Sequence, residues 1–174
     1  MITNPQFNIE IDKLTRSIES VISGESFKTA ISKLTSENLK DIRKKDWLFD
    51  WKDEINNKIR NVYKLSIIGK PEIIQGLISL QDKGDHIYMH LIESSKFNRG
   101  RRKEYLGVPG NMVAFACKQS IDKGYKGFVS FESKSKLINH YQKTLGAEVL
   151  FNNIMAINTE AANKLLNQYF TENL

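Results

Sequence analysis

Hydrophobic and polar positions alternate along this 174-residue chain with two different periods. Between residues 9 and 22, apolar side chains recur every three or four positions, which predicts an amphipathic helix. Residues 27–34 favour a strand. Thr35 or Ser36 then predicts the start of a short helix that reaches Ile42, because a side-chain oxygen at that point accepts the first free N–H groups of a helix.

The middle of the chain has the period of two that is typical of strands. Residues 61–68 and 71–79 are rich in β-branched and apolar side chains, and residues 82–85 (Asp-Lys-Gly-Asp) predict a hairpin turn. Residues 86–93 then alternate. Strict alternation places Ile87, Met89 and Leu91 on one face of a strand, and Tyr88, His90 and Ile92 on the other.

The C-terminal half mixes both periods. Its predicted elements are a helix at 111–123, a strand at 127–131, a helix that ends at 143, two strands at 148–151 and 154–157, and a helix from Thr159. Gly124 and Gly146 are placed to end two of these helices, and Asn152-Asn153 is placed to turn the hairpin, since Asn tolerates positive φ. The fold class that follows is α/β (α+β), with a mixed, mostly antiparallel central sheet flanked by helices.

A glycine-containing turn at residues 107–110 precedes the helix at 111–123. Unpaired N–H groups point outward at the start of a helix and its dipole favours negative charge, so this turn is a candidate anion site. A run of cations lies just before it: Lys96, Arg99, Arg101, Arg102 and Lys103. Such a run is most often a solvated loop, but its position beside the turn favours a phosphorylated ligand.

The composition narrows the class of protein. A formal net charge of +6 and a pI near 9.3 permit a nucleic acid or a phosphorylated ligand but require neither. The only cysteine, Cys117, excludes a disulfide framework and is expected to be a small buried hydrophobic residue. The N-terminus lacks the pattern of a signal peptide and no apolar run approaches the ~20 residues of a membrane helix, so we expect a cytoplasmic, soluble protein without a metal centre.

The order of elements around the glycine turn resembles that of the GNAT superfamily of N-acetyltransferases over about residues 27–158. In that family the fourth strand splays from the fifth, and acyl-CoA inserts between them. The family's pyrophosphate loop has the pattern Q/R-x-x-G-x-G/A, which residues 104–109 fit best. Two positions depart from it, because Glu104 replaces Gln or Arg and Pro109 has no N–H to donate. The resemblance implies a GNAT-like domain at residues 27–174. Residues 1–26 lie outside the resemblance, and we expect them to form an N-terminal helical arm.

A second match lies downstream. In many family members the next helix ends in a pattern like L-Y-x-K-x-G-F, and residues 140–146 approach it with the glycine one residue later. Tyr141 falls at the tyrosine that, in the family, lies near the CoA sulfur and can protonate the leaving thiolate. Lys134 stands where an Asn is common. The resemblance therefore implies an acyl-CoA-dependent N-acyltransferase that transfers an acetyl group directly from acetyl-CoA to a primary amine.

Residues implied in binding the acyl donor come from the end of the strand at 86–93, the basic run, the glycine turn and the segment before Tyr141. They are Leu91, Ile92, Arg101, Arg102, Lys103, Gly107, Val108, Gly110, Asn111 and Lys134. The family meets the oxyanion of the reaction with a backbone amide of its fourth strand, which would lie near residues 91–93 here.

Acyl transfer to an amine needs a base for the amine and an acid for the thiolate. Glu93 is the first candidate base and Tyr141 the candidate acid, and each also has a structural interpretation, as a strand-end carboxylate and as a packing aromatic. His90 is the second candidate base. Strict alternation places His90 and Glu93 on opposite faces, unless the strand bulges between them.

Three alternating aromatic residues, Trp47, Phe49 and Trp51, either line an acceptor pocket or belong to the core. Four carboxylates accompany them, and an acidic rim there would favour a cationic amine: Asp46, Asp50, Asp53 and Glu54. Small amines, protein N-termini, lysines and aminoacyl-tRNA all remain open as acceptors. No membrane partner is expected, nucleic acid is expected only as a tRNA-linked acceptor, and a homodimer is left open.

Two other classes of function stay open. A GNAT-fold protein with weak or no catalysis would serve as a sensor or an interaction partner, which the departures at Pro109 and Lys134 favour. A basic nucleic-acid-binding module would use residues 96–103 to follow phosphates. No recognised nucleic-acid motif accompanies that run, which weighs against the second class.

Overall fold

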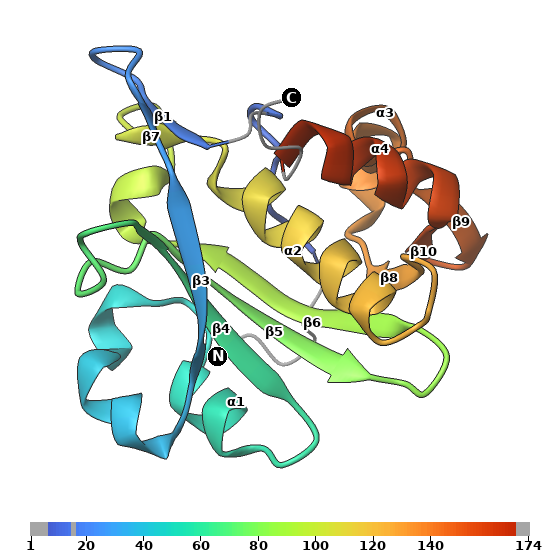
Figure 1. Ribbon diagram of the computed structural model, residues 1–174, viewed down its shortest axis with the longest axis horizontal. Coiled ribbons are helices and arrows are strands. Elements are labelled where there is room, and N and C mark those ends of the chain that lie inside the picture. The colour runs from blue at the N-terminus through green and yellow to red at the C-terminus, as the bar shows by residue number, and fades with distance from the viewer. Residues whose placement is uncertain (1–6, 15–16, 170–174) are drawn as a thin grey trace.

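A seven-stranded sheet with one parallel pair runs through the molecule (Figure 1). The computed structural model describes residues 7–14 and 17–169. Across the sheet the strands lie in the order β3 (Thr29–Leu34), β4 (Asn61–Ile67), β5 (Gly76–Asp82), β6 (Ile87–Ser94), β8 (Val129–Glu132), β10 (Ile154–Ile157) and β9 (Glu148–Phe151). All neighbours are antiparallel except β6 and β8. The mixed, mostly antiparallel sheet predicted from the sequence is confirmed.

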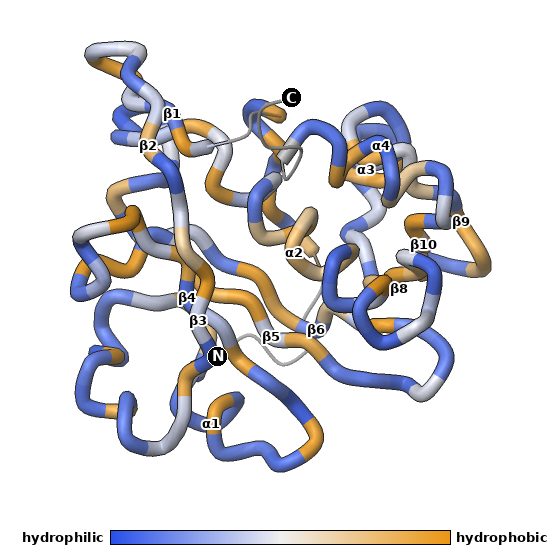
Figure 2. The backbone as a smooth tube through the Cα atoms, in the orientation of Figure 1, coloured by the Kyte–Doolittle hydropathy of each residue, from blue (hydrophilic) through white to orange (hydrophobic). Residues whose placement is uncertain are grey.

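Helices cover both faces of this sheet (Figure 1). The α-helices are α1 (Trp51–Asn56), α2 (Val108–Asp122), α3 (Ile138–Leu145) and α4 (Thr159–Tyr169), and the 3₁₀ turns are η1 (Ser36–Asp41), η2 (Lys44–Asp46), η3 (Lys96–Asn98) and η4 (Ser135–Leu137). The main hydrophobic cluster joins α2 and α4 to one face. A second cluster on the other face joins Trp51 of α1 to Leu77 and Leu91. Figure 2 shows the corresponding hydrophobic residues along β5 and β6.

A small second sheet ties the N-terminal region to the glycine turn. Its central strand β1 (Ile18–Ser20) pairs antiparallel with β2 (Ser26–Phe27) and with β7 (Tyr105–Leu106). β7 ends directly before Gly107. The chain segment around β1 therefore helps to fix the position of that turn.

β5 begins with a glycine that lets α2 approach closely. A Cβ on Gly76 would lie 2.7 Å from Met112 Cε and 3.0 Å from Val108 Cγ1, both buried side chains of α2. Gly76 is also paired with Ser94 at the end of β6. The N-terminus of α2 is thus held beside the end of β6.

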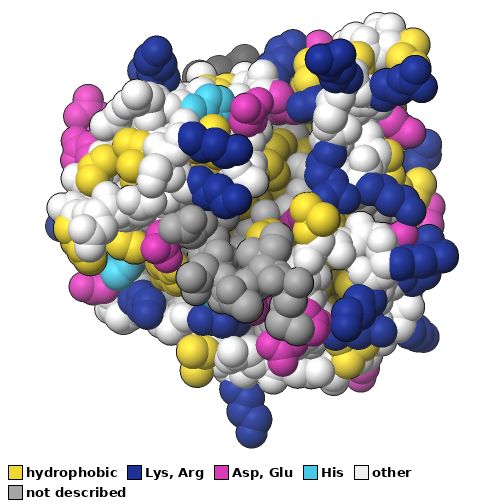
Figure 3. Space-filling model, turned by 180° about the vertical axis from the view of Figure 1, so that it is seen from behind, with side chains coloured by type: hydrophobic (Ala, Val, Ile, Leu, Met, Phe, Trp, Pro, Cys, Tyr) yellow, Lys and Arg dark blue, Asp and Glu magenta, His cyan; other side chains and the backbone are white. Residues whose placement is uncertain are grey.

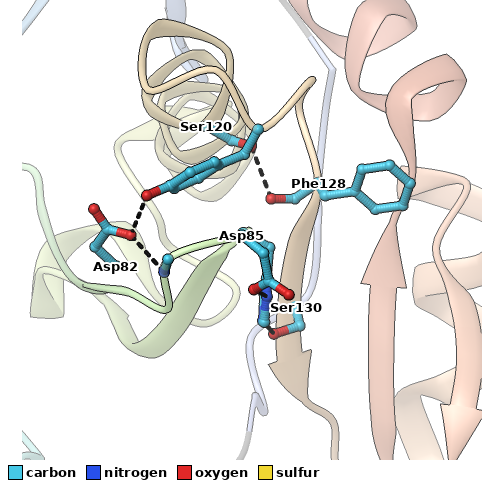
Figure 4. A network of polar contacts seen from close by, with 8 residues as sticks. Asp82, Asp85, Ser120, Phe128 and Ser130 are labelled. Carbon is cyan, nitrogen blue, oxygen red and sulfur yellow. Dashed lines mark hydrogen bonds and ion pairs between the residues drawn. The ribbon is translucent and has the colours of Figure 1, made fainter.

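A polar network fixes the other end of β6 (Figure 4). The Tyr125 hydroxyl donates to Asp82 over 2.7 Å and links the segment after α2 to the β5–β6 hairpin. His86 lies between Asp85 and Ser130, with its ring nitrogens 2.7 and 2.9 Å from their side-chain oxygens. These contacts join the start of β6 to β8, so the two strands are held together at this end.

Most elements predicted from the sequence are confirmed. Thr35 caps η1 with its side chain, Gly146 ends α3 with a φ of 67°, and Asn152 turns the last hairpin with a φ of 49°. The predicted strand at 71–79 is wrong in its first half, because the strand begins only at Gly76 and a turn precedes it.

The predicted helix at 9–22 is wrong in the part that the structure describes. Residues 8–14 contain no helical turn, and Ile18–Ser20 is strand β1. The backbone there bonds to distant segments, since Ile11 N–H donates to His140 and Val21 N–H to the carbonyl of Glu104. β-branched side chains favour extended backbone, and Ile11 and Ile18 are buried in the main cluster. The apolar spacing therefore marked a buried extended segment.

Cys117 is buried inside α2, as the sequence predicts. Burial raises the pKa of its thiol to about 12, so the side chain is uncharged at neutral pH and packs as an apolar group. Among the described residues, no helix combines the length and the apolar character needed to cross a membrane.

Candidate functional site

The candidate site lies where β6 and β8 part. The two strands pair only from Ile87 with Val129 to Met89 with Phe131. β6 continues to Ser94 and stays paired with β5 on its other side. The second half of β6 therefore faces a groove, at the place where the resemblance expects the fourth and fifth strands to splay.

A β-bulge in β6 decides which side chains face the same way. Leu80 pairs with Met89 and the adjacent Ser79 with Leu91, so His90 is an extra residue in β6. Met89 packs in the main cluster, whereas Leu91 packs in the second cluster around Trp51. The alternation predicted from the sequence is therefore wrong beyond Met89. The bulge brings His90 and Glu93 to the same face, the one covered by α1.

Glu93 is buried, with 3% of its surface exposed, and its carboxylate accepts four N–H donors. The backbone N–H groups of Leu48 and Phe49 donate over 2.8 and 3.1 Å, the Trp51 indole over 3.0 Å and the Arg99 guanidinium over 3.4 Å. A carboxylate has about four lone-pair sites, so these donors occupy its acceptor capacity. Glu93 thus ties the aromatic segment at 47–51 to the end of β6.

His90 belongs to a separate buried cluster around Glu54. Glu54 accepts from His90 Nδ1 at 2.5 Å and from the Ser79 hydroxyl at 2.6 Å, and Arg60 lies 3.6 Å away. Burial alone pushes the pKa of the Glu54 carboxyl up, but the hydrogen bonds from His90 and Ser79 outweigh it and leave the pKa below its ordinary value. With Nδ1 directed to a carboxylate, His90 Nε2 is the nitrogen left to accept a proton.

The N-terminus of α2 is the predicted anion site. Gly107 precedes the helix with a φ of 95°, and Pro109 lies in its first turn. The N–H of Asn111 is already bonded to the carbonyl of Gly107 at 3.0 Å. The N–H of Gly107 donates to a carboxylate oxygen of Asp12 at 3.0 Å. An anion therefore does sit at this turn, and it belongs to the chain itself.

Residues 7–14, called the N-terminal strap below, lie along the groove. Phe7 N–H donates to the carbonyl of Glu132 and the Phe7 carbonyl accepts from Lys134 N–H, at 2.6 and 3.0 Å. Between them, Ser133 N–H is bonded to Asn153 on the β10 side. The strap therefore occupies the edge of β8 that faces β6. Phe7 is also stacked on Phe131, with ring centroids 4.8 Å apart.

The strap then crosses from α3 to α2. The carbonyl of Ile9 accepts from the Tyr141 hydroxyl at 2.5 Å, and Ile11 N–H donates to His140 Nε2 at 2.8 Å. Asp12 accepts from Gly107 N–H and forms an ion pair with Lys103 at 3.0 Å. One short segment therefore touches both the tyrosine and the glycine turn that the sequence singled out.

Tyr141 is fully buried beneath the strap. Burial raises the pKa of its hydroxyl well above the ordinary value of 10.0, so the side chain keeps its proton at neutral pH. A protonated hydroxyl can serve as a general acid.

A cavity of about 280 Å³ remains between the strap, the end of β6 and the segment at 48–49. Its lining includes Ile9 and Asp12 of the strap, Phe49, Ile92 and Glu93, and the cations Arg99, Lys103 and Lys134. In the rear view of the molecule, Lys and Arg side chains gather around a central hollow (Figure 3). The cavity joins an apolar floor to cations, which suits an elongated ligand with a charged group.

The residues predicted to bind an acyl donor are only partly brought together. Ile92, Lys103 and Lys134 line the cavity. Gly107, Val108, Gly110 and Asn111 lie at the start of α2, and all four are buried. Leu91 packs in the second cluster, on the far side of β6 from Ile92. Arg101 and Arg102 are exposed in a turn.

Sequence reasoning missed Asp12, Ile9 and the partnership of Glu54 with His90. Asp12 lies 95 residues from Gly107 along the chain, and no local pattern relates the two. Glu54 and His90 lie on different elements, so their contact could not be predicted before the fold was known. Only the bulge condition stated for His90 and Glu93 pointed toward the arrangement that the structure has.

No protein-family model matches the chain, and no curated protein matches it in sequence. Solved structures match it in fold. The KacTA–DNA complex aligns with 80% of this chain and 99% of its own at a TM-score of 0.55 and 13% identity. The structure of AtaTR bound with AcCoA aligns with 79% of this chain and 98% of its own, at a TM-score of 0.51 and 16% identity. A GNAT family acetyltransferase from Elizabethkingia anophelis with acetyl-CoA bound aligns with 75% of this chain and 97% of its own, at a TM-score of 0.52 and 10% identity. The chain has the GNAT acetyltransferase fold.

Proposed function

We propose that this protein is an acyl-CoA-dependent N-acyltransferase that uses acetyl-CoA to acylate a primary amine by direct transfer. The observation that carries the proposal is the divergence of β6 from β8 after Met89 and Phe131. The strap that runs along this groove contacts the buried Tyr141 through Ile9 and the glycine turn of α2 through Asp12. Two structural neighbours with this fold hold acetyl-CoA, which supports the same donor here.

The donor would lie in the groove with its phosphates at the start of α2. The Gly107 N–H and the Lys103 ammonium are the groups suited to the pyrophosphate, because both already hold a carboxylate there. Lys134 lines the same cavity and adds positive charge. The thioester would lie toward Tyr141.

In the reaction, the amine nitrogen attacks the thioester carbonyl carbon and forms the new C–N bond. The C–S bond then breaks, and the thiolate takes its proton from the Tyr141 hydroxyl. His90 lies outside the lining of the cavity, so the amine gives its proton to His90 Nε2 through water, and the Glu54 carboxylate orients the imidazole through Nδ1. We assign Glu93 the role of a positioning residue, because its four N–H partners leave it little capacity to accept a proton.

The aromatic segment at 47–51 is proposed to form the acceptor side of the site. Phe49 and Leu48 line the cavity opposite the strap. The acidic rim has fewer open carboxylates than its sequence suggests, since Asp46 pairs with Arg43 and Lys96 and Asp50 caps α1. The hydrogen bond from Lys96 comes first among the causes that lower the pKa of Asp46. Selection of a cationic amine by this rim is therefore not part of the proposal.

The test is release of CoA thiol from acetyl-CoA in the presence of an amine panel. The panel contains a small diamine, a peptide with a free N-terminus, a lysine peptide with a blocked N-terminus and an aminoacyl-tRNA. We expect amine-dependent thiol release with at least one of them, and the acetylated amine detected by mass spectrometry. Binding of acetyl-CoA without release across the panel would overturn the catalytic proposal.

That last outcome would favour a sensor or interaction protein with the GNAT fold, the second candidate function. The observation behind it is that the strap already occupies the β8 edge of the groove. A nucleic-acid-binding module is less supported, since three cations of residues 96–103 are paired within the chain: Lys96 with Asp46, Arg99 with Glu93 and Lys103 with Asp12.

A further inference from the structure

We propose that the N-terminal strap is an intramolecular competitor of the acyl donor, with the Asp12 carboxylate at the position of the donor's pyrophosphate. This inference rests on the proposed function, because it concerns the groove assigned to acyl-CoA. The strap is a segment of the same chain, so its effective concentration at the groove is high and independent of protein concentration.

The strap already supplies an anion to the glycine turn. The Gly107 N–H and the Lys103 ammonium are the two groups best placed for a phosphate, and both are bonded to Asp12. A helix N-terminus and a cation favour any anion, and a carboxylate here replaces the one expected from the ligand. A phosphate and Asp12 cannot both hold these two donors.

The backbone of the strap also occupies the edge of the groove. An extended ligand in a splayed pair of strands bonds to the strand edges, and the edge of β8 facing β6 is filled by Phe7 through Glu132 and Lys134. Farther along, the Ile9 carbonyl holds the Tyr141 hydroxyl. The group proposed to protonate the thiolate is therefore also engaged by the strap.

Phe7 and residues 9–12 of the strap are held by different contacts. Phe7 is 2% exposed and stacked on Phe131, which makes it an apolar anchor. Residues 9–12 make polar contacts at Tyr141, His140, Gly107 and Lys103, and Ile11 is also buried in the main cluster. A ligand can replace the polar contacts, whereas exposure of Ile11 adds an apolar cost that extraction of the larger Phe7 ring would increase further. We therefore expect residues 9–12 to leave the groove while Phe7 stays.

The main experiment follows amide hydrogen exchange in the full-length protein with and without saturating acetyl-CoA. In the closed form, Ile11 N–H is bonded to His140 and Phe7 N–H to Glu132, so both amides are protected. The proposal expects faster exchange at Ile11 when acetyl-CoA is bound, with the Phe7 amide as the internal reference. Unchanged or slower exchange at Ile11 with acetyl-CoA bound would show that the strap is a wall of the site, and would overturn the proposal.

A variant tests the same point by affinity. Asp12→Ala frees Gly107 and Lys103, so acetyl-CoA should bind about tenfold more tightly in calorimetry, because a larger fraction of molecules has an open groove. Glu72→Ala is the matched control, since it removes the same charge from an exposed position away from the groove. Equal or weaker binding by Asp12→Ala overturns the competitor role and leaves the proposed function standing if the wild type binds. Absence of binding by both proteins overturns the proposed function itself.

Discussion

The hydroxyl of Tyr141 has one partner in the closed groove, the Ile9 carbonyl, and a different proposed partner during the reaction, the thiolate. Tyr141→Phe should therefore lower two kinetic constants, each for a different reason. We expect kcat to fall by about 10²-fold or more, because a general acid is lost. The KM for acetyl-CoA should fall modestly, because the strap loses a hydrogen bond. Steady-state thiol release measures both constants.

Tyr125→Phe is the matched control for that substitution. It removes a hydroxyl that donates to Asp82 at the hairpin end of the molecule, away from the groove. Both constants should stay near those of the wild type. An unchanged kcat in Tyr141→Phe would eliminate the acid role.

Glu93 offers a second test at the scale of one residue, because its two proposed roles predict different results. Glu93→Gln keeps one acceptor oxygen but replaces the other by an NH₂ group, which meets the Leu48 N–H and Arg99 instead of accepting from them. Buried donors left without a partner cost about 1–3 kcal/mol each, so the free energy of unfolding should fall by that order. Urea denaturation measures it, with the exposed Glu72→Gln as the control.

The comparison of stability with turnover separates the two roles of Glu93. If Glu93 is a positioning residue, Glu93→Gln lowers stability and turnover together, because the segment at 48–51 is no longer held to β6. A loss of turnover at unchanged stability would instead restore Glu93 as the base.

At the scale of elements, α1 is held to the sheet through the Glu54 carboxylate, so its contribution to stability depends on pH. The pKa of the Glu54 carboxyl lies below its ordinary value of 4.5 in the folded protein. The stabilisation that follows is present above pH 4.5 and is lost as the pH falls through the folded-state pKa. Glu54→Gln should therefore be less stable than the wild type at pH 7 and lose less further stability on acidification.

Urea titrations between pH 7 and about pH 3 test that expectation. Glu72→Gln again serves as the control, since its side chain is exposed. Parallel pH profiles for Glu54→Gln and the wild type would contradict a depressed pKa at Glu54.

Elements were predictable from the sequence where local signals and tertiary contacts agree. α2 and α3 end at glycines with positive φ, and Asn152 turns the last hairpin, because these signals act over a few residues. The helix predicted at 9–22 was wrong because the backbone partners of the strap lie far away in sequence, at Glu132 and His140. The bulge at His90 likewise depends on the pairing of β5 with β6 and leaves no mark in the alternation itself. The location of the anion site was predictable, but its internal occupant was not.

At the scale of the whole molecule, the net charge of +6 favours anionic ligands without choosing among them. The fold narrows the choice, since the cations near the groove converge on one cavity and several of the others are already paired. A ligand that binds only the folded state raises the free energy of unfolding according to its concentration and dissociation constant. Thermal unfolding of the whole chain therefore distinguishes a CoA thioester from a nucleic acid.

Acetyl-CoA at about one hundred times its dissociation constant should stabilise the protein by roughly 2.7 kcal/mol, or a Tm shift of roughly 5–10 °C for a chain of this size. A single-stranded oligonucleotide at the same phosphate concentration should give no comparable shift, because the proposed donor groove offers cations for one pyrophosphate and not a track for successive phosphates. At a fixed, subsaturating concentration of acetyl-CoA, the Tm of Asp12→Ala should rise more than that of the wild type. The reason is that the strap no longer closes the groove in a fraction of the molecules. Stabilisation by the oligonucleotide alone would instead assign the cations of residues 96–103 to nucleic acid.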